Sequence, residues 1–397
     1  MKLHTCIRLS LALLALQAAL PASADGWTAH LRYRHEAVAD DAFARDAAAD
    51  TLRLRLGWSH ALARGFSTGF ELEGVVEAGD RFNSGANGRT AYPLVPDARA
   101  LELNQAWLRW RGERGGASLG RQRISFDNQR FIGNVGWRQN EQTFDGLSAD
   151  ATLREGLVLR YAWLDRVHRV FGDQALDPLA RERRLDAHLL NMAWQGTAGT
   201  VVGYGYWLED EDVAAASTRT LGLRWTGQRP RGAATFGWTL EAANQRDHAG
   251  NPNAIDVDYF LVEPSLTAAG LTWKLGWEQL GGNGIRAFQT PLATLHAFNG
   301  WADKFLVTPA RGLEDLQLSV TGKFGTGRLE DRLAWTLAWH DYQAAKGDVR
   351  YGREWNASLA FPLPGRLAGL VKVADYRSAG FARDTRKLWL QVEWAWP

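Results

Sequence analysis

The feature that most constrains the fold of this sequence is an alternation of apolar and polar residues within many short segments. The clearest example spans residues 52–58, where every second side chain is large and apolar. Because successive side chains of a β-strand point to opposite faces, Arg53 and Arg55 share the face opposite the apolar set. That apolar set is Leu52, Leu54, Leu56 and Trp58. Strands of this kind are typical of a transmembrane β-barrel.

The alternation predicts an all-β fold, a transmembrane antiparallel β-barrel of about 18 strands, an even number as in bacterial barrels. The first strand is expected to begin at Trp27, with Arg32 and Arg34 facing inward. The second is the segment around Leu52. Sixteen more are expected near residues 66–78, 100–111, 117–124, 143–150, 156–164, 185–195, 199–209, 218–226, 233–244, 255–267, 270–280, 313–324, 329–340, 351–361, 366–377 and 385–396.

The connectors between these segments alternate in length. Every second connector is short and rich in turn residues, as at 63–65, 112–116, 196–199, 227–232, 269–270, 325–327 and 362–365. The others are longer and polar, at 37–50, 79–99, 165–184, 245–254, 281–312 and 341–350. Short periplasmic turns and long extracellular loops follow the rule for outer-membrane barrels, and an even strand count puts both termini in the periplasm.

A soluble β-sandwich or propeller is the structural alternative. Neither fold predicts a wide aromatic outer face on nearly every strand. A propeller should also show a repeat of roughly 40–50 residues, and the sequence has none. The barrel is therefore the favoured interpretation.

Residues 1–24 have the features of a secretory signal peptide. Lys2 and Arg8 precede an apolar run at 9–20, and Ala22 and Ala24 form a small-x-small cleavage site. The run is too short for a membrane anchor, which needs about 20 apolar residues. Cleavage after Ala24 would remove Cys6, the one cysteine, and leave residues 25–397 as a single outer-membrane barrel domain.

Charge and composition narrow the class. Removing the predicted signal peptide leaves 44 basic and 44 acidic residues, so a general attraction to nucleic acid is not supported. Of the 46 basic residues in the full chain, 39 are arginine, the side chain suited to holding carboxylates in a fixed geometry. The 19 tryptophans suit the aromatic girdles of a barrel. Mean hydropathy of −0.30, without a long apolar run after residue 24, excludes a helical membrane protein.

A barrel of this size has a lumen too wide for side chains to fill. Arg53 and Arg55 are expected to face it, and two polar connectors are candidates to narrow it. Residues 121–142 mix arginines, amides and aromatics, groups that bind sugars well; this connector is either a constriction loop or a structured exit loop. The candidate solute contacts in the two connectors are Arg123, Asp127, Asn128, Arg130, Arg138, Gln139 and Glu141, then Arg286, Asp303 and Lys304.

These two connectors also resemble a known family. The segments RQR (121–123), DNQRFIG (127–133), WRQNEQTFDG (137–146), RAFQTPLATLHAFNGWADKF (286–305) and DTRKLWL (384–390) are similar to the alginate export family of outer-membrane proteins. The resemblance implies an eighteen-stranded, porin-like barrel with an arginine-rich pore that conducts an anionic polysaccharide outward. The neutral charge of the predicted mature chain differs from the strongly positive pore that this family implies.

The sequence does not favour an enzyme. Barrel hydrolases need a serine–histidine–acid set or paired acids on one face, and the nine histidines are scattered. His30 and His35 differ in parity and so face opposite sides of their strand. No metal-binding histidine motif occurs, so neither a metal nor another cofactor is expected.

Three functions remain open. The first is a passive channel of the alginate-export type for an anionic polysaccharide or oligosaccharide. The second is a general or small-solute porin without polymer specificity, and the third is an adhesion or structural protein of the outer membrane. The expected partners are outer-membrane lipid, a sugar polymer as solute and, for export, separate periplasmic proteins.

Overall fold

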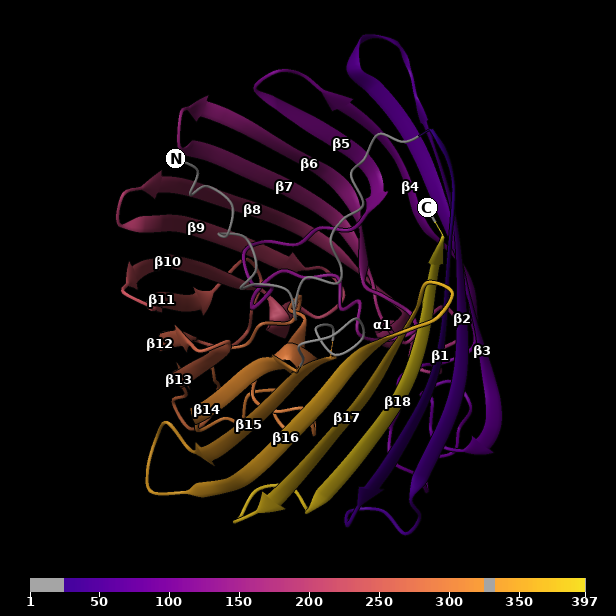
Figure 1. Cartoon of the computed structure of the whole chain (residues 1–397), viewed down its shortest axis with the longest axis vertical. Helices are drawn as coiled ribbons and strands as arrows, with labels where there is room; N and C mark the ends of the chain where they lie inside the picture. Colours follow the sequence, from indigo (N-terminus) through magenta and orange to yellow (C-terminus); the bar gives the residue numbers. More distant parts are fainter. Residues whose placement is uncertain (1–24, 325–332, 397) are drawn as a thin grey trace.

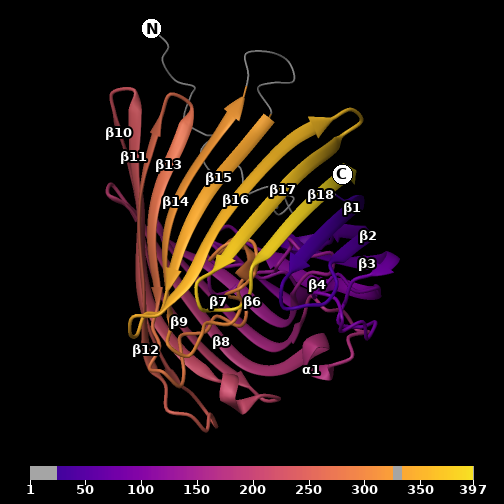
Figure 2. The ribbon, with the colours of Figure 1, turned by 90° about the horizontal axis from the view of Figure 1, so that it is seen from below.

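The computed structural model describes residues 25–324 and 333–396, and within them one antiparallel sheet of 18 strands closes on itself. Each strand pairs with its sequence neighbours, and β1 (Gly26–Asp40) pairs with both β2 (Ala47–Ala61) and β18 (Thr385–Trp396). Figure 1 shows the resulting ring of tilted strands, and Figure 2 shows the same ring from below. The predicted fold class and strand number are confirmed.

The remaining strands follow in chain order. They are β3 (Phe66–Arg81), β4 (Ala100–Arg111), β5 (Gly115–Gln122), β6 (Thr143–Arg154), β7 (Leu157–His168), β8 (Glu182–Gly196), β9 (Gly199–Asp210), β10 (Thr218–Arg231), β11 (Ala234–Asp247), β12 (Asp256–Ala268), β13 (Leu271–Leu280), β14 (Leu313–Phe324), β15 (Leu333–Gln343), β16 (Arg350–Leu363) and β17 (Leu367–Ser378). Helical structure is confined to α1 (Pro178–Arg181) and three short 3-10 turns in the described part of the chain.

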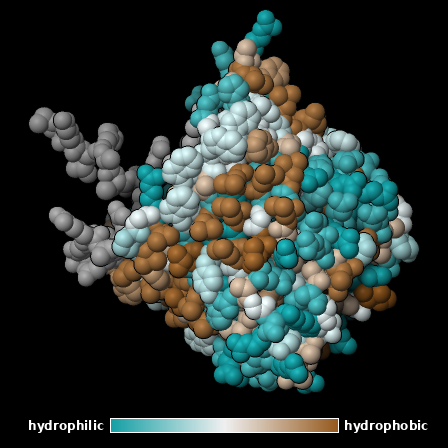
Figure 3. Space-filling model, turned by 90° about the vertical axis from the view of Figure 1, so that its right-hand side faces the viewer, coloured by the Kyte–Doolittle hydropathy of each residue, from teal (hydrophilic) through white to brown (hydrophobic). Residues whose placement is uncertain are grey.

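The register of the ladder explains why the surface is apolar. Leu31 pairs with Leu54 and Arg32 pairs with Arg53, so these two strands place apolar side chains on one face and charged side chains on the other. Leu54 is 41% exposed, whereas Arg53 is 0% exposed. The usual pattern of a soluble protein is therefore reversed, with apolar residues outside and charge inside. Figure 3 shows apolar side chains gathered across one outer face, with hydrophilic side chains toward its edges.

Connector lengths differ between the two ends of the barrel. Turns such as residues 112–114 and 197–198 close one end, and the loops at 82–99, 123–142, 169–181 and 281–312 lie at the other. The expected loop at 37–50 is wrong: β1 continues to Asp40 and β2 begins at Ala47, so only residues 41–46 connect them. Alanine-rich sequence there, including Ala37, Ala47 and Ala49, weakened the apolar signal although these residues pair in the ladder.

Some expectations fall outside the described residues. These are the predicted signal peptide at 1–24, the turn at 325–327 and the first four residues of the strand expected at 329–340. Among the residues described, no helix has the length and apolar character needed to cross a membrane.

The packed core lies inside the ring. Its aromatic members come from inward positions of the strands, such as Tyr259 on β12 and Trp389 on β18, and from two loops, through Phe131 and Phe288. Long-loop residues therefore supply side chains that fill the interior. This arrangement positions the candidate site.

Candidate functional site

The β5–β6 loop, residues 123–142, folds into the lumen. From its start beside β5 it reaches β8, where Asn191 donates a hydrogen bond to Asp127 (2.7 Å), and β13, where Arg130 binds Glu278 (2.7 Å). Its far end reaches β1, where Arg138 donates to Glu36 (3.0 Å). One loop thus contacts widely separated parts of the wall, and of the two alternatives the structure shows an inward loop (Figure 1).

The β13–β14 loop, residues 281–312, pairs with it. Ile132 and Leu292 form a parallel bridge, and the Gly133 amide donates to the Leu292 carbonyl (2.9 Å). The Gln142 amide group donates to the carbonyls of both Gly133 and Leu292 (2.8 and 3.0 Å). These bonds satisfy backbone groups that would otherwise be stranded inside the barrel, and they join the two loops into one unit.

Arg130 anchors this unit to the wall. Its guanidinium donates to Glu278, to the Thr290 hydroxyl (3.3 Å) and to the Asn299 side chain (3.0 Å). The side chain is buried, and its guanidinium lies 4.8 Å from the centre of the Phe298 ring. These contacts use the hydrogen-bond donors of the guanidinium, so Arg130 holds the two loops against the wall.

Asp303 is the second anchor. It accepts hydrogen bonds from Arg138 (3.0 Å) and Lys387 (2.8 Å), and His296 Nδ1 lies 2.7 Å away. Burial alone would raise the pKa of the Asp303 carboxyl, but the neighbouring His296, Lys387 and Arg138 outweigh it and hold that pKa well below its usual range. The carboxylate therefore stays charged and ties both loops to β18.

Lys372 of β17 completes this anchor. Its ammonium lies 2.7 Å from His296 Nε2 and over the rings of Trp137 (4.1 Å) and Trp301 (3.9 Å). The imidazole of His296 stacks on Trp137 with ring centres 4.7 Å apart. A lysine donor on one ring nitrogen and a carboxylate acceptor at the other fix a neutral imidazole.

A third group of charges lies where the β5–β6 loop begins and ends. Glu141 accepts hydrogen bonds from Asn104 (2.6 Å), from Asn134 (2.9 Å) and from Arg123. Burial raises the pKa of Glu141, yet Arg123 and Arg55 more than compensate, so that pKa lies well below its usual range. Arg123 also binds Glu71 of β3, and its side chain remains about one-third exposed (32%).

The wall next to this group carries what we call the arginine patch, which consists of Arg32, Arg53, Arg55 and Arg123. Three of its members have carboxylate partners: Arg32 binds Glu393, Arg55 binds Glu73, and Arg123 binds Glu71 and Glu141. Arg53 differs. It donates to His30 Nδ1 (2.8 Å), no described carboxylate lies within ion-pair distance, and its Nε and Nη1 atoms have no hydrogen-bond acceptor in the described chain. Arg53 is therefore the member of the patch without a carboxylate partner among the described residues.

The structure divides the twelve predicted solute contacts into two groups. Buried or ion-paired within the fold are Arg53, Arg55, Arg130, Arg138, Gln139, Glu141, Asp303 and Lys304, the last through Asp40 (2.6 Å). Solvent reaches Arg123, Asp127, Asn128 and Arg286. Arg286 stands apart from the others, at a loop tip where it donates to Asn253 (2.6 Å). Contact of any of these residues with a solute stays a prediction.

Sequence reasoning missed several anchors. Glu36, Lys372 and Lys387 were not singled out, yet each holds one of the inward loops. The alternation of side chains along a strand could have identified two of them. Glu36 continues the inward set of Arg32 and Arg34 on β1, and Lys387 precedes the outward Leu388. The role of His296 depends on contacts with three separate segments, and nothing local signals it.

A closed 18-stranded barrel in the described chain, with an apolar exterior and two polar loops folded inside, defines an outer-membrane channel. The family model for alginate export matches residues 27–280. The chain belongs to the alginate export family, and like its family it is a channel of the Gram-negative outer membrane rather than an enzyme. No curated protein matches the sequence.

Solved structures share the fold at low sequence identity. The outer-membrane protein OpdK of Pseudomonas aeruginosa is 16% identical, with 94% of this chain and 98% of that chain covered and a TM-score of 0.70. OccAB4 of Acinetobacter baumannii is 14% identical over 93% and 97% of the two chains, with a TM-score of 0.73. OccK2 (OpdF) of P. aeruginosa, solved in complex with glucuronate, is 14% identical over 94% and 98%, with a TM-score of 0.68.

Proposed function

We propose that the channel passes sugars that carry carboxylates, as uronate oligomers or an anionic polysaccharide, by passive diffusion. The observation that carries the proposal is the arginine patch, in which solvent reaches Arg123 (32% exposed). Each acid of the patch is already held by an arginine, and the buried Arg53 behind Arg123 has donors without acceptors among the described residues. Arginine donors bind carboxylates in a charge-assisted geometry, which favours an anionic solute over a neutral one.

Membership of the alginate export family supports the polymer form of this proposal. A chain of uronates would meet the exposed Arg123 first, with Arg53 behind it in the same patch. Because the acids of the patch are paired, they present little free negative charge to repel such a chain.

A small-solute porin is the second candidate. The two inward loops occupy part of the lumen and are fixed by buried ion pairs, an arrangement that suits single small molecules. Two P. aeruginosa structures of the same fold support this reading through their ligands: OccK2 was solved with glucuronate and OpdK with vanillate, both carboxylates.

Planar-bilayer recording separates the two. We expect uronate oligomers to block the conductance reversibly and neutral glucose oligomers of equal length to leave it unchanged. Arg123→Gln should weaken the block by about tenfold, the loss expected for one charge-assisted contact. The control is Arg353→Gln, since Arg353 lies on the outer face of β16 (59% of its side chain is exposed).

Three outcomes of these recordings would contradict one or both of the candidate functions. Equal block by charged and neutral oligomers would contradict carboxylate recognition. Block by single uronates together with indifference to oligomers would favour the small-solute porin. Absence of conductance in a folded barrel would contradict both.

A further inference from the structure

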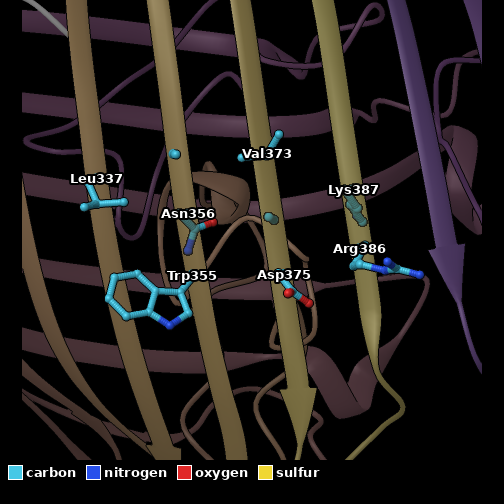
Figure 4. Close-up of a pocket in the computed structure, with 9 residues that line it drawn as sticks. Leu337, Trp355, Asn356, Val373, Asp375, Arg386 and Lys387 are labelled. Carbon is cyan, nitrogen blue, oxygen red and sulfur yellow. The ribbon is translucent and has the colours of Figure 1, made fainter.

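The outer face of the barrel has a hollow over β15–β18. Its volume is about 270 Å³, and the side chains that form its walls include Leu337, Trp355, Val373 and Arg386. Figure 4 shows Trp355, Asp375 and Arg386 along one end of the hollow and Leu337 and Val373 toward the other. The hollow lies on the side of the sheet that faces the membrane, opposite to the solute pathway.

The ladder register explains the hollow. Ala357 pairs with Leu337 on one side and with Val373 on the other, so one outward row has a small residue between two larger ones. The next row toward the long loops places Trp355 opposite Asp375, and Asp375 opposite Arg386. Trp355 is 54% exposed and stands at the edge of the floor made by Ala357. The result is an apolar recess with a polar end.

Arg386 is the charged group at that end. Its neighbour Asp375 is bound by Arg377 (3.0 Å), and the residue opposite on β1 is Ala39. Arg386 itself has no ion pair or hydrogen bond to the rest of the described chain. An exposed guanidinium without a partner, beside an apolar recess, complements a molecule with an anionic head and a hydrocarbon tail.

The orientation of the recess relative to the membrane agrees with binding of such a molecule. Arg386 is the second residue of β18 after the loop at 379–384, and Ala357 lies seven positions into β16. The charge is therefore near the long-loop end, which faces outward in such barrels, and the apolar floor lies deeper in the membrane. A lipid of the outer leaflet has the same order, with its phosphate at the surface and its acyl chains below.

We propose that this hollow binds one phosphorylated lipid of the outer leaflet, with an acyl chain over Ala357 and the phosphate on Arg386. A second hollow, of about 700 Å³, lies near α1 and has more arginines. There, however, Arg121, Arg166 and Arg184 are each paired with an acid, and Arg181 donates to the Ala175 carbonyl (2.6 Å), so each of these arginines already has a partner.

Native mass spectrometry of the full chain in uncharged detergent tests the site. Dimyristoyl phosphatidylglycerol is the phosphate probe, and dimyristoyl glycerol is the same lipid without the phosphate. We expect one phosphatidylglycerol to be retained, with about tenfold weaker retention in Arg386→Gln and unchanged retention of dimyristoyl glycerol. Ala357→Leu, which fills the floor, should weaken retention of both. Arg353→Gln is the control, because Arg353 is also exposed on the outer face but lies beside Asp341 (3.5 Å).

A second measurement, with a conservative variant at another position, keeps the proposal testable if Arg386→Gln or Ala357→Leu misfolds. Phosphatidylglycerol with brominated chains should quench more fluorescence in the wild type than in Trp355→Phe, because the tail lies against that ring. Equal retention by wild type and Arg386→Gln, or an equal loss in Arg353→Gln, would overturn the site. So would a stable dimer that excludes the lipid, since a second barrel would then cover this face.

Discussion

The arginines of this channel differ in role according to their partners, although the sequence shows them alike. Arg130 and Arg138 each bind a carboxylate of the wall and are almost fully buried, so they hold the loops. Arg123 stays about one-third exposed although it binds Glu71 and Glu141, and Arg53 behind it lies opposite Arg32 without a carboxylate partner in the described chain. Composition alone predicted an arginine-rich interior, but only the contacts and the exposed fractions separate the structural arginines from the one that a solute can reach.

Asp303→Asn tests the anchoring role. The substitution leaves Arg138 and Lys387 buried without their shared carboxylate, so we expect the free energy of unfolding to fall by about 3 kcal/mol. Chemical denaturation of the barrel in micelles measures it. Asp256→Asn is the matched control, because Asp256 pairs with Arg246 at an exposed site and should change stability little. Equal effects of the two substitutions would contradict the anchor.

The buried His296 predicts a pH dependence. Burial, with a further contribution from Lys372 and Arg138, lowers its pKa well below the ordinary value of about 6.5, against the opposing effect of Asp303. The unfolded chain therefore takes up the proton first. The contribution of His296 to stability should be constant above about pH 7 and should be lost as the pH drops below about 6.5.

Thermal unfolding between pH 8 and pH 5 measures this decrease. His296→Gln cannot take up the proton, so its curve should be flatter over the same range. An identical decrease in the wild type and in His296→Gln would assign the effect to other groups.

Among the elements, the two inward loops depend on close approach to the wall. Gly300 has a left-handed backbone (φ 84°), and an added Cβ would lie 2.2 Å from the Tyr342 hydroxyl and 2.4 Å from Glu354 Oε2. Gly284 has a similar backbone (φ 98°), but nothing lies within 4 Å of its Cβ position. Comparison of substitutions at these two glycines therefore separates the effect of backbone strain from the effect of lost loop docking.

We expect Gly300→Ala to cost about 1–3 kcal/mol more than Gly284→Ala, because only the former also meets a packed wall. The undocked loop should make single-channel current larger and noisier. Recording both variants under the same conditions provides the comparison, and indistinguishable currents would show that the loop does not narrow the pathway.

The strands could be predicted from sequence and the loops could not. Alternation is a local property, so segments such as the one around Leu52 identified both the strand and its inward face. Docking of residues 123–142 depends on Glu36, Glu278 and Asn191, which lie far away in the chain. No local pattern encodes those pairings. At the alanine-rich ends of β1 and β2 the strand prediction itself was incomplete, because these residues pair in the ladder without a strong apolar signal.

For the whole molecule, the central prediction is closure between the first and last strands. Ala37 lies opposite Leu388 in the β1–β18 ladder. The double variant Ala37→Cys/Leu388→Cys should form a disulfide on oxidation, since directly opposite residues of antiparallel strands meet the required spacing. Electrophoresis of the unfolded chain, with and without reductant, detects the link. Cys6 lies in the predicted signal peptide, so no native thiol should interfere.

The control for closure pairs Ala37→Cys with Val373→Cys. Val373 belongs to β17, which pairs with β16 and β18 but not with β1. A closed ring should give no link in this variant. A link here, or its absence between residues 37 and 388, would contradict the ring.

The anchors at Glu36, Lys372 and Lys387 have a consequence for assembly. They belong to β1, β17 and β18. The β5–β6 and β13–β14 loops are therefore bound to the part of the wall where the first and last strands of the chain pair. The contact between Lys387 and Asp303 cannot form until the final strand is in place. A barrel whose last strand has not yet paired would therefore lack one of the contacts that hold its inner loops.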